Sequence, residues 1–297
     1  MIKFLFLALF IFSKAIIAQE KNYSISDKYS LENFSKMKII HNHLQKVKIY
    51  DIEYRSTDNL KIKGFLIEPN NLSEKYPVVI YNRGGNGGYG MVSEPFIVNF
   101  LSKIASSGFI VIGSQLRGSQ GSEGVDEFGG KDINDVNSLF NIIKDLKNAD
   151  TTKIAQIGWS RGGITNFQML KKTNKIKTTI NIAGPSDILS TKRKEMFKVY
   201  QNRIKNYSLD SIYYSKKVSP IFQIDSIRNK KESFLFLHGD NDDKVDISNS
   251  LDLFEKTCKS GFYSEIIIFK NEDHNLFNQK EKLIQDIITW LKKRITS

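Results

Sequence analysis

Hydrophobic residues in this chain occur in short continuous runs, and these runs alternate with amphipathic segments. The continuous runs, typical of strands buried on both faces of a sheet, occupy residues 77–81, 109–113, 153–158, 176–183, 234–237 and 265–269. Segments with apolar residues at helical spacing lie at residues 96–107, 132–146, 164–170, 247–258 and 283–291. Strands that alternate with helices in this way predict a largely parallel sheet with helices on both faces, which is an α/β fold.

The first part of the chain follows other patterns. Residues 19–45 are polar, and we expect them to be an irregular N-terminal segment ahead of a domain that spans residues 46–297. Residues 47–56 and 60–68 alternate apolar and polar side chains around a turn at Asp58 and Asn59. This alternation predicts an antiparallel hairpin at the entrance to the sheet.

The chain begins with a segment typical of exported proteins. A nine-residue apolar run at residues 4–12 follows a short basic start, and Ala18 offers a small residue for cleavage. The pattern predicts a signal peptide at residues 1–18, cut after Ala18, and a secreted or periplasmic protein. An uncleaved anchor is the alternative, but the run is short for a bilayer. We therefore expect no stable membrane insertion after cleavage.

Composition and charge exclude several classes of function. The formal net charge is +12, but the lysines are scattered and form no basic run interleaved with aromatic residues, so we expect no nucleic-acid partner. Cys258 is the only cysteine, which excludes an internal disulfide. His41 and His43 have no further histidine, cysteine or paired carboxylate at ligand spacing, so we expect no metal site.

The residues around Ser160 carry the strongest chemical signal. A buried strand at residues 153–158 ends at Gly158, Ser160 and Gly162 follow, and a helix begins shortly afterwards. Strand, Gly-x-Ser-x-Gly and helix in this order predict the nucleophile elbow of an α/β-hydrolase fold. Glycines are needed on both sides because the turn strains the serine backbone and brings strand and helix close together. Ser160 is the predicted nucleophile, and a purely structural turn is the alternative.

The fold places its acid and its base after the nucleophile in the chain. His274 lies in a polar loop after the last strand, where a base can reach a serine at the strand ends. His238 lies at a strand terminus, and we interpret it as structural. The acid should follow the preceding strand, where the pattern alone leaves four candidates: Asp240, Asp242, Asp243 and Asp246.

Two glycine-rich loops follow buried strands. Residues 83–88 contain four glycines in five positions, which indicates that backbone N–H groups approach a reacting oxyanion; a plain flexible loop is the alternative. Residues 117–124 have no Lys-Ser/Thr pair after them and no dinucleotide glycine spacing, which excludes a phosphate-binding loop. We expect no cofactor.

Residues 186–231 break the strand–helix alternation. This stretch is basic and aromatic, and we interpret it as helices inserted as a cap over the active site, where they would set specificity. Ordinary surface helices with a packed aromatic stripe are the alternative. The residues concerned are Lys192, Arg193, Lys194, Phe197, Tyr200, Arg203, Tyr213 and Tyr214.

Several motifs in one order resemble the catalytic domain of the prolyl oligopeptidase family of serine hydrolases. They lie at residues 117–121, 128–135, 150–163, 218–221, 237–245 and 272–274. The block at residues 237–245 is similar to the family's His-Gly-x-x-Asp-x-x-Val, and this resemblance implies that Asp242 is the acid. It likewise implies that His274 is the base.

The chain also departs from the family pattern. It has Arg83-Gly84-Gly85-Asn86 where members often carry His-Gly-Gly-Pro or a tyrosine. By position, the implied oxyanion donors are the N–H groups of Arg161 and Gly85, with Gly84 as a further candidate. Larger family peptidases carry a β-propeller that filters substrates, for which we expect no room here, so peptidase activity does not follow from the resemblance.

The sequence therefore predicts an exported serine hydrolase. Ser160 attacks an ester or peptide carbonyl of a small-molecule substrate, His274 transfers the proton, and Asp242 orients His274, without a metal or organic cofactor. The alternative is a catalytically silent protein whose basic, aromatic cap holds an acidic polymer. The sequence predicts neither peptide nor ester preference, nor the oligomeric state.

Overall fold

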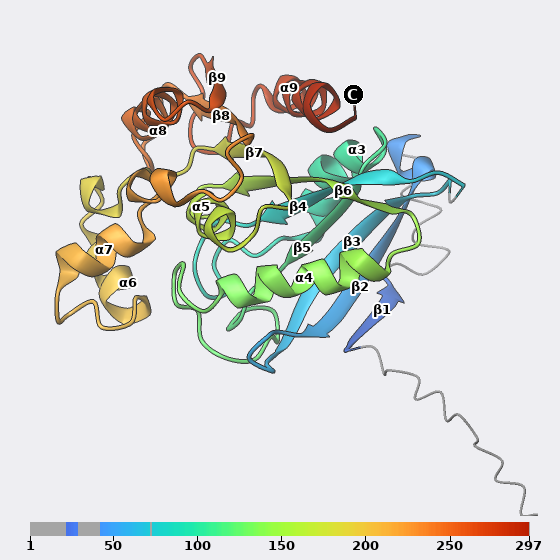
Figure 1. The fold of residues 1–297 in the computed structure, drawn as a ribbon, viewed down its shortest axis with the longest axis horizontal. Helices are drawn as coiled ribbons and strands as arrows, with labels where there is room; N and C mark the ends of the chain where they lie inside the picture. Colours follow the sequence, from blue (N-terminus) through green and yellow to red (C-terminus); the bar gives the residue numbers. More distant parts are fainter. Residues whose placement is uncertain (1–21, 29–41, 72, 297) are drawn as a thin grey trace, which may run out of the picture.

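The computed structural model describes residues 22–28, 42–71 and 73–296. The predicted signal peptide lies outside these residues. A single nine-stranded sheet crosses the described part of the molecule, with helices on both faces (Figure 1). This is the α/β-hydrolase architecture that the alternation of apolar runs and amphipathic segments predicts.

The sheet is antiparallel at its start and parallel over the rest of its width. Its strand order is β1-β2-β3-β5-β4-β6-β7-β8-β9. Every neighbouring pair from β5 onward in this order is parallel, and the pairs before it are antiparallel. The strands are β1 Tyr23–Asp27, β2 Val47–Arg55, β3 Lys61–Pro69, β4 Tyr76–Asn82, β5 Ile110–Ser114, β6 Ala149–Trp159, β7 Ile176–Ile182, β8 Ser233–Gly239 and β9 Tyr263–Phe269.

The helices divide between the two faces, and each face has its own apolar core. One core contains side chains of α3 and α9, and the other contains those of α4, α5 and α8. A short π-helical segment, Ile97–Leu101, joins α2 to α3. The helices are α2 Glu94–Phe96, α3 Ser102–Ala105, α4 Ile133–Asp145, α5 Gly162–Lys172, α6 Glu195–Arg203, α7 Ser211–Val218, α8 Ser248–Lys259 and α9 Lys280–Leu291.

The predicted strands, helices and hairpin are confirmed, with one correction near the N-terminus. Tyr23–Asp27, expected to be irregular, forms β1 and pairs with β2. Only Tyr23 is partly buried, and the side chains of β1 are exposed over the rest of its length. An edge strand gains its stability from backbone hydrogen bonds to one neighbour, so it needs no buried side chains of its own.

The stretch at residues 186–231 lies between β7 and β8 and is helical. It contains α6, α7 and the short 3₁₀ segments Ile188–Ser190, Pro220–Phe222 and Ile224–Ser226. In Figure 1, α6 and α7 project from the body of the domain beyond the sheet. A small apolar core joins these helices to the domain through Phe128, Ile164, Ile188, Tyr200, Ile204, Tyr207 and Val218.

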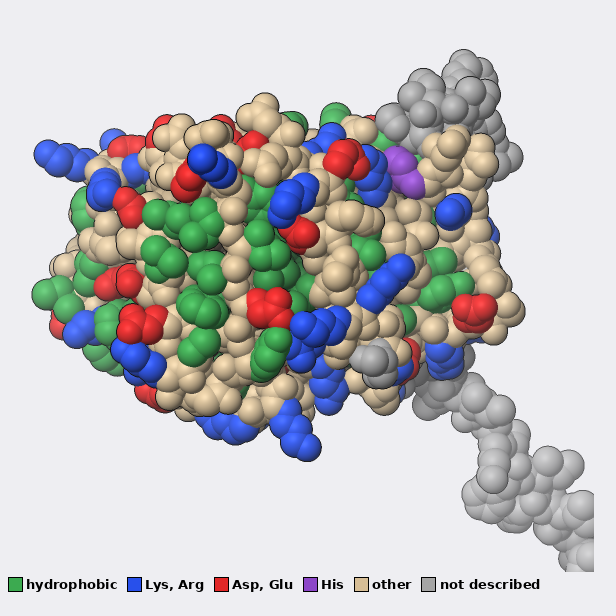
Figure 2. All heavy atoms as spheres, turned by 90° about the horizontal axis from the view of Figure 1, so that it is seen from above, with side chains coloured by type: hydrophobic (Ala, Val, Ile, Leu, Met, Phe, Trp, Pro, Cys, Tyr) green, Lys and Arg blue, Asp and Glu red, His purple; other side chains and the backbone are tan. Residues whose placement is uncertain are grey.

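Charged side chains are dispersed over the surface. On the face shown in Figure 2, basic side chains are interspersed with acidic ones and with hydrophobic patches. Among the described residues, no helix has the length and apolar character required to cross a bilayer.

Candidate active site

Ser160 lies on a strained turn between β6 and α5. Its φ is 54°, in the left-handed region that is rare for a non-glycine residue. The Ser160 N–H donates to the Ile182 carbonyl of β7 at 2.7 Å. A Cβ at Gly162 would lie 2.0 Å from the Asn82 oxygen, and one at Gly158 would lie 2.3 Å from the Gly162 oxygen. Both glycines are thus required by close backbone approach, as the elbow motif predicts.

The acid and base loops meet beside this elbow. Asp242 follows β8 and His274 follows β9, and the His274 Nδ1 lies 2.8 Å from Asp242 Oδ2. The other Asp242 oxygen accepts the N–H groups of Lys244 and Val245 at 2.8 and 2.9 Å. This geometry places Asp242 in the position of a triad acid.

The other three aspartates have different partners. Asp240 accepts the Asn271 N–H at 2.6 Å. Asp243 is exposed and pairs with Lys244 at 2.9 Å, and Asp246 pairs with Lys192. None of the three has a hydrogen bond or ion pair with His274, so among these four aspartates only Asp242 contacts it.

His238 lies against the same carboxylate. Its Nε2 lies 3.1 Å from Asp242 Oδ2 and 2.8 Å from the Val245 carbonyl, and its Nδ1 lies 2.6 Å from Ser250 Oγ. Since both neighbours of Nε2 are acceptors, Nε2 carries the proton and donates it. His238 is fully buried. The interpretation of His238 as structural missed this contact with the acid.

The hydrogen bonds around Asp242 set its charge. Burial alone would raise the pKa of the Asp242 carboxyl, but hydrogen bonds from His238 and His274 outweigh it and hold the pKa well below its usual range. The carboxylate is therefore ionised at neutral pH, and it can stabilise a protonated His274.

The His274 loop is attached to the elbow and to the acid loop. The indole Nε1 of Trp159, next to Ser160, donates to the His274 carbonyl at 3.1 Å. The Asn241 N–H donates to the Glu272 carbonyl at 3.0 Å. These two hydrogen bonds, one from a side chain and one within the backbone, fix the relative positions of the three loops.

The glycine-rich loop after β4 runs past the nucleophile. A Cβ at Gly84 would lie 3.1 Å from the Cβ of Ser160 and 3.8 Å from its Oγ. Gly85 has a φ of 69°, and a Cβ there would lie 2.0 Å from the Tyr89 oxygen. The loop is therefore folded tightly back on itself at the place where an oxyanion would form, rather than extended as a flexible linker.

Arg161 follows the nucleophile, but its side chain is buried under this loop. Its guanidinium pairs with Asp126 at 2.6 Å and Asp132 at 2.5 Å and donates to the Gly85 carbonyl at 3.0 Å. Asp126 in turn accepts the Gly87 N–H at 2.7 Å. Burial would lower the pKa of Arg161, but the two carboxylates raise it above its ordinary value. The side chain thus supports the loop and is not free to bind a substrate.

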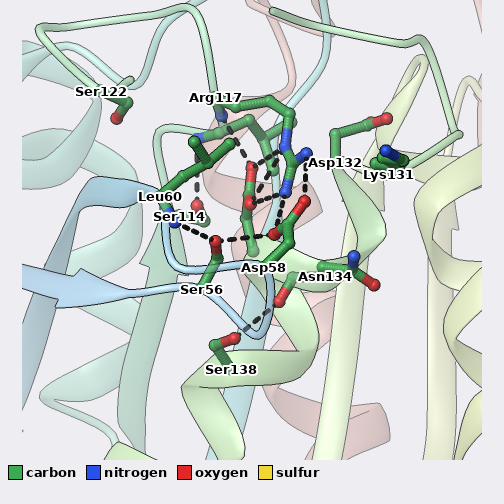
Figure 3. A network of polar contacts seen from close by, with 12 residues as sticks. Ser56, Asp58, Leu60, Ser114, Arg117, Ser122, Lys131, Asp132, Asn134 and Ser138 are labelled. Atoms are coloured by element: carbon green, nitrogen blue, oxygen red, sulfur yellow. Dashed lines mark hydrogen bonds and ion pairs between the residues drawn. The ribbon is translucent and has the colours of Figure 1, made fainter. Parts of the chain in front are cut away.

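The second glycine-rich loop has a structural anchor. Arg117 makes two bonds of 2.8 Å to the oxygens of Asp58, in the β2–β3 turn, and one of 2.7 Å to Asp135 of α4. Figure 3 shows the Arg117 guanidinium beside the Asp58 carboxylate. This cluster, in which Arg117 and Asp135 are buried and Asp58 is partly exposed, connects the hairpin to the helix that follows the loop.

One cavity of about 790 Å³ contains all the predicted site residues. Ser160, Asp242, His274, Gly84, Gly85 and Arg161 all border it. Helix α6 and the preceding 3₁₀ segment form one wall of this cavity. The apolar side chains that line the cavity include Val92, Phe96, Phe128, Ile188, Met196, Val199 and Tyr200. Among the described residues, no group of three or more His, Cys, Asp or Glu side chains could hold a metal ion.

A serine on a nucleophile elbow, with a His–Asp pair in the same cavity, defines a serine hydrolase of the α/β-hydrolase fold. Comparison with protein families supports the same class of enzyme. The model of the prolyl oligopeptidase family matches residues 97–297, more than half of the chain, and the chain belongs to this family. A model of acetyl xylan esterase matches residues 21–134.

Relatives in sequence include peptidases. The chain is 29% identical to the uncharacterized peptidase YtmA of Bacillus subtilis over 259 residues, which cover 84% of this chain and 95% of that protein. It is 26% identical to dipeptidyl aminopeptidase A of Saccharomyces cerevisiae over 84% of this chain, but this match covers only 28% of the yeast protein.

Solved structures share the fold. The acylaminoacyl peptidase of Pyrococcus horikoshii has a TM-score of 0.71 at 22% identity, covering 86% of this chain and 43% of that one. The Pyrococcus furiosus esterase Pf2001 has a TM-score of 0.63 at 16% identity, covering 90% and 96% of the two chains. The chain thus spans nearly all of the YtmA peptidase and of this esterase, and less than half of the other two proteins.

Proposed function

We propose that this protein is exported and cleaves an ester or peptide bond of a small substrate through an acyl-enzyme on Ser160. The observation that carries the proposal is the 2.8 Å contact between His274 and Asp242 in the cavity that Ser160 borders. A histidine oriented by a buried, ionised carboxylate is the base that a serine nucleophile needs.

The reaction would proceed in two halves. The Ser160 Oγ attacks the carbonyl carbon, its proton passes to His274 Nε2, and the carbonyl oxygen becomes an oxyanion. When the tetrahedral intermediate collapses, His274 protonates the leaving alcohol or amine, which leaves the acyl group on Ser160. Water then attacks the acyl-enzyme with His274 as base, which releases the acid and restores the serine.

The oxyanion would be stabilised by backbone donors. Arg161 opens helix α5, and its N–H and the N–H of Gly85 are the proposed pair, with Gly84 as the further candidate. The helix N-terminus adds a positive potential at the same place. Donors fixed in advance by a rigid loop stabilise the charge without reorganising during the reaction.

The substrate is proposed from the cavity and the relatives together. The apolar wall formed by α6 fits an acyl or side-chain group of moderate size, in a site of about 790 Å³. The relatives include a protein named as a peptidase and one named as an esterase, each nearly matched in length. Both reactions use the same triad and differ in the leaving group, which is an alcohol for an ester and an amine for a peptide.

Export is proposed from the apolar run at residues 4–12 and the small residue Ala18. Expression of the full chain in a Gram-negative host, followed by N-terminal sequencing of the periplasmic fraction, would test it. A mature chain starting at Gln19 is expected, and a full-length chain retained in the cytoplasm would contradict the proposal.

The catalytic proposal is tested with a panel of p-nitrophenyl esters and aminoacyl p-nitroanilides, using wild type, Ser160→Ala and His274→Ala. We expect turnover and labelling by a fluorophosphonate in the wild type and the loss of both in each variant. Labelling of wild type that persists in Ser160→Ala would identify a different nucleophile, and folded wild type without labelling or turnover would contradict the proposal.

A further inference from the structure

Arg83, the residue that begins the glycine-rich loop, is a buried cation held by carbonyl groups. Its side chain is 1% exposed. In the described part of the chain no carboxylate lies within ion-pair distance of it. Its guanidinium donates instead to four backbone oxygens: Gln115 at 2.7 Å, Gly84 at 3.0 Å, Tyr89 at 3.0 Å and Gly87 at 2.5 Å.

Three of these four oxygens belong to the loop that passes Ser160. A single planar guanidinium therefore fixes the start, the middle and the end of the loop. Lysine could not make the same four hydrogen bonds, because its donors all belong to one nitrogen, whereas a guanidinium donates from three nitrogens in one plane. The loop's own glycines have no side chains with which to hold its shape.

The bond to Gly84 has a chemical consequence. The Gly84 carbonyl and the Gly85 N–H belong to the same peptide group, and that N–H is the proposed oxyanion donor. A cation bonded to the carbonyl oxygen polarises the peptide and makes its N–H a stronger donor. Arg161 makes the equivalent bond one peptide later, to the Gly85 carbonyl, but two carboxylates neutralise its charge.

We propose that Arg83 is a positioning residue of the oxyanion hole, which it shapes and polarises through the Gly84–Gly85 peptide. This inference rests on the proposed function of the Ser160 site. Arg83 makes no hydrogen bond to Ser160 and does not border the cavity. Its effect is expected on the transition state and not on the binding of the ground-state substrate, because the oxyanion exists only after Ser160 has attacked.

The test compares Arg83→Lys and Arg83→Gln with wild type. For p-nitrophenyl acetate we expect kcat to fall roughly ten- to hundredfold with KM nearly unchanged, less than the loss expected when an oxyanion donor is removed outright. The affinity for a trifluoromethyl ketone, whose oxygen occupies the oxyanion position, should fall by about the same factor as kcat/KM.

Arg117→Lys is the matched control. Arg117 is equally buried and also belongs to a glycine-rich loop, but it pairs with Asp58 and Asp135, away from the cavity. This variant should lower the melting temperature and leave both kcat and the inhibitor affinity of the folded protein unchanged.

The outcomes separate this inference from the proposed function. A wild type that neither labels with fluorophosphonate nor turns over ester contradicts the function itself. With an active wild type, unchanged kcat in both Arg83 variants would overturn the inference. The inference would also be overturned if the Arg83 variants changed KM alone, or if their loss of kcat were no larger than that of Arg117→Lys. Unfolding of both Arg83 variants would assign the residue to stability alone and would equally overturn it.

Discussion

In the proposed mechanism, Asp242 is the residue that orients the base. Its side chain is fully buried and accepts hydrogen bonds from two histidines and two backbone N–H groups. The two histidines are fixed through a single carboxylate oxygen. A neutral amide in its place would offer donors where the site needs an acceptor, and His274 would lose the charge that stabilises its protonated form.

Asp242→Asn is therefore expected to lower kcat by roughly 10⁴-fold, the scale seen when a triad acid becomes an amide. The rate of p-nitrophenyl acetate hydrolysis measures it. Asp243→Asn serves as the control, because Asp243 is exposed and pairs only with its neighbour Lys244. Equal activity of the two variants would show that Asp242 is not the acid.

At this scale local pattern in the sequence proposes a nucleophile and a base, which stay predictions, and leaves the acid open. Ser160 lies between two glycines that the turn requires, and His274 lies after the last strand. The four aspartates after β8 share the same local pattern, so only the resemblance to the family separated Asp242 from the others. The contacts of Arg83 and His238 were not predicted. Most of their partners lie close to them in the chain, but irregular loop turns bring these groups together, and such turns leave no periodic signal in the sequence.

Among the elements, the glycine-rich loop after β4 depends on particular glycines. Gly85→Ala places a Cβ 2.0 Å from the Tyr89 oxygen, at a φ of 69° that alanine disfavours. The loop must shift, and kcat should fall by roughly 10²-fold or more, as for a lost oxyanion donor. Gly88→Ala is the control in the same loop, because no atom lies within 4 Å of its added Cβ.

Both loop variants are measured by fluorophosphonate labelling rate and by thermal melting. Slow labelling of Gly85→Ala together with normal labelling of Gly88→Ala is expected. If Gly85→Ala labels as fast as wild type, the loop does not contribute the oxyanion donors.

Helix α6 should influence which substrates fit. Val199 lines the cavity, and Val199→Phe would fill part of it. We expect kcat/KM for p-nitrophenyl octanoate to fall roughly tenfold and that for the acetate to change little, because the acetate leaves this space empty. Lys198→Phe adds the same ring at an exposed position of the same helix. Parallel losses for both esters in Val199→Phe would argue against a role of α6 in selecting the acyl group.

For the whole molecule, the pattern of apolar runs predicted the sheet but not its edge strand β1. Strands buried on both faces are continuous apolar runs, so β4 to β8 were visible in the sequence. In β1 the side chains are mostly exposed and the pairing with β2 uses only the backbone, which leaves no periodic signal. The helical stretch at residues 186–231 could be predicted as a break in the alternation, but its packing on Phe128 and Ile164 depends on long-range contacts.

The buried Glu232 makes the stability of the whole domain depend on pH. It lies just before β8, at the opposite end of that strand from Asp242, and it is 1% exposed. Its Oε1 accepts the hydroxyl of Thr179 at 2.9 Å. Burial raises the pKa of Glu232 to about 8, whereas an unfolded chain has a glutamate pKa of about 4.3.

The direction of the effect follows from proton binding. Between the two pKa values the folded protein holds a proton that the unfolded chain releases, so the free energy of unfolding falls as the pH rises through this window. This loss of unfolding free energy is absent below about pH 4 and reaches at most about 5 kcal/mol above pH 8. The domain should therefore lose stability between pH 5 and 8 for a reason unrelated to the triad.

Glu232→Gln removes the titration and keeps an oxygen for Thr179. Its melting temperature should exceed that of wild type by a margin that grows from pH 5 to pH 8, with kcat at pH 7 unchanged because the residue is remote from Ser160. Glu53→Gln, in a half-exposed pair with Lys61, is the control and should follow wild type at every pH. A constant difference between Glu232→Gln and wild type across this range would show that Glu232 is already ionised in the folded protein.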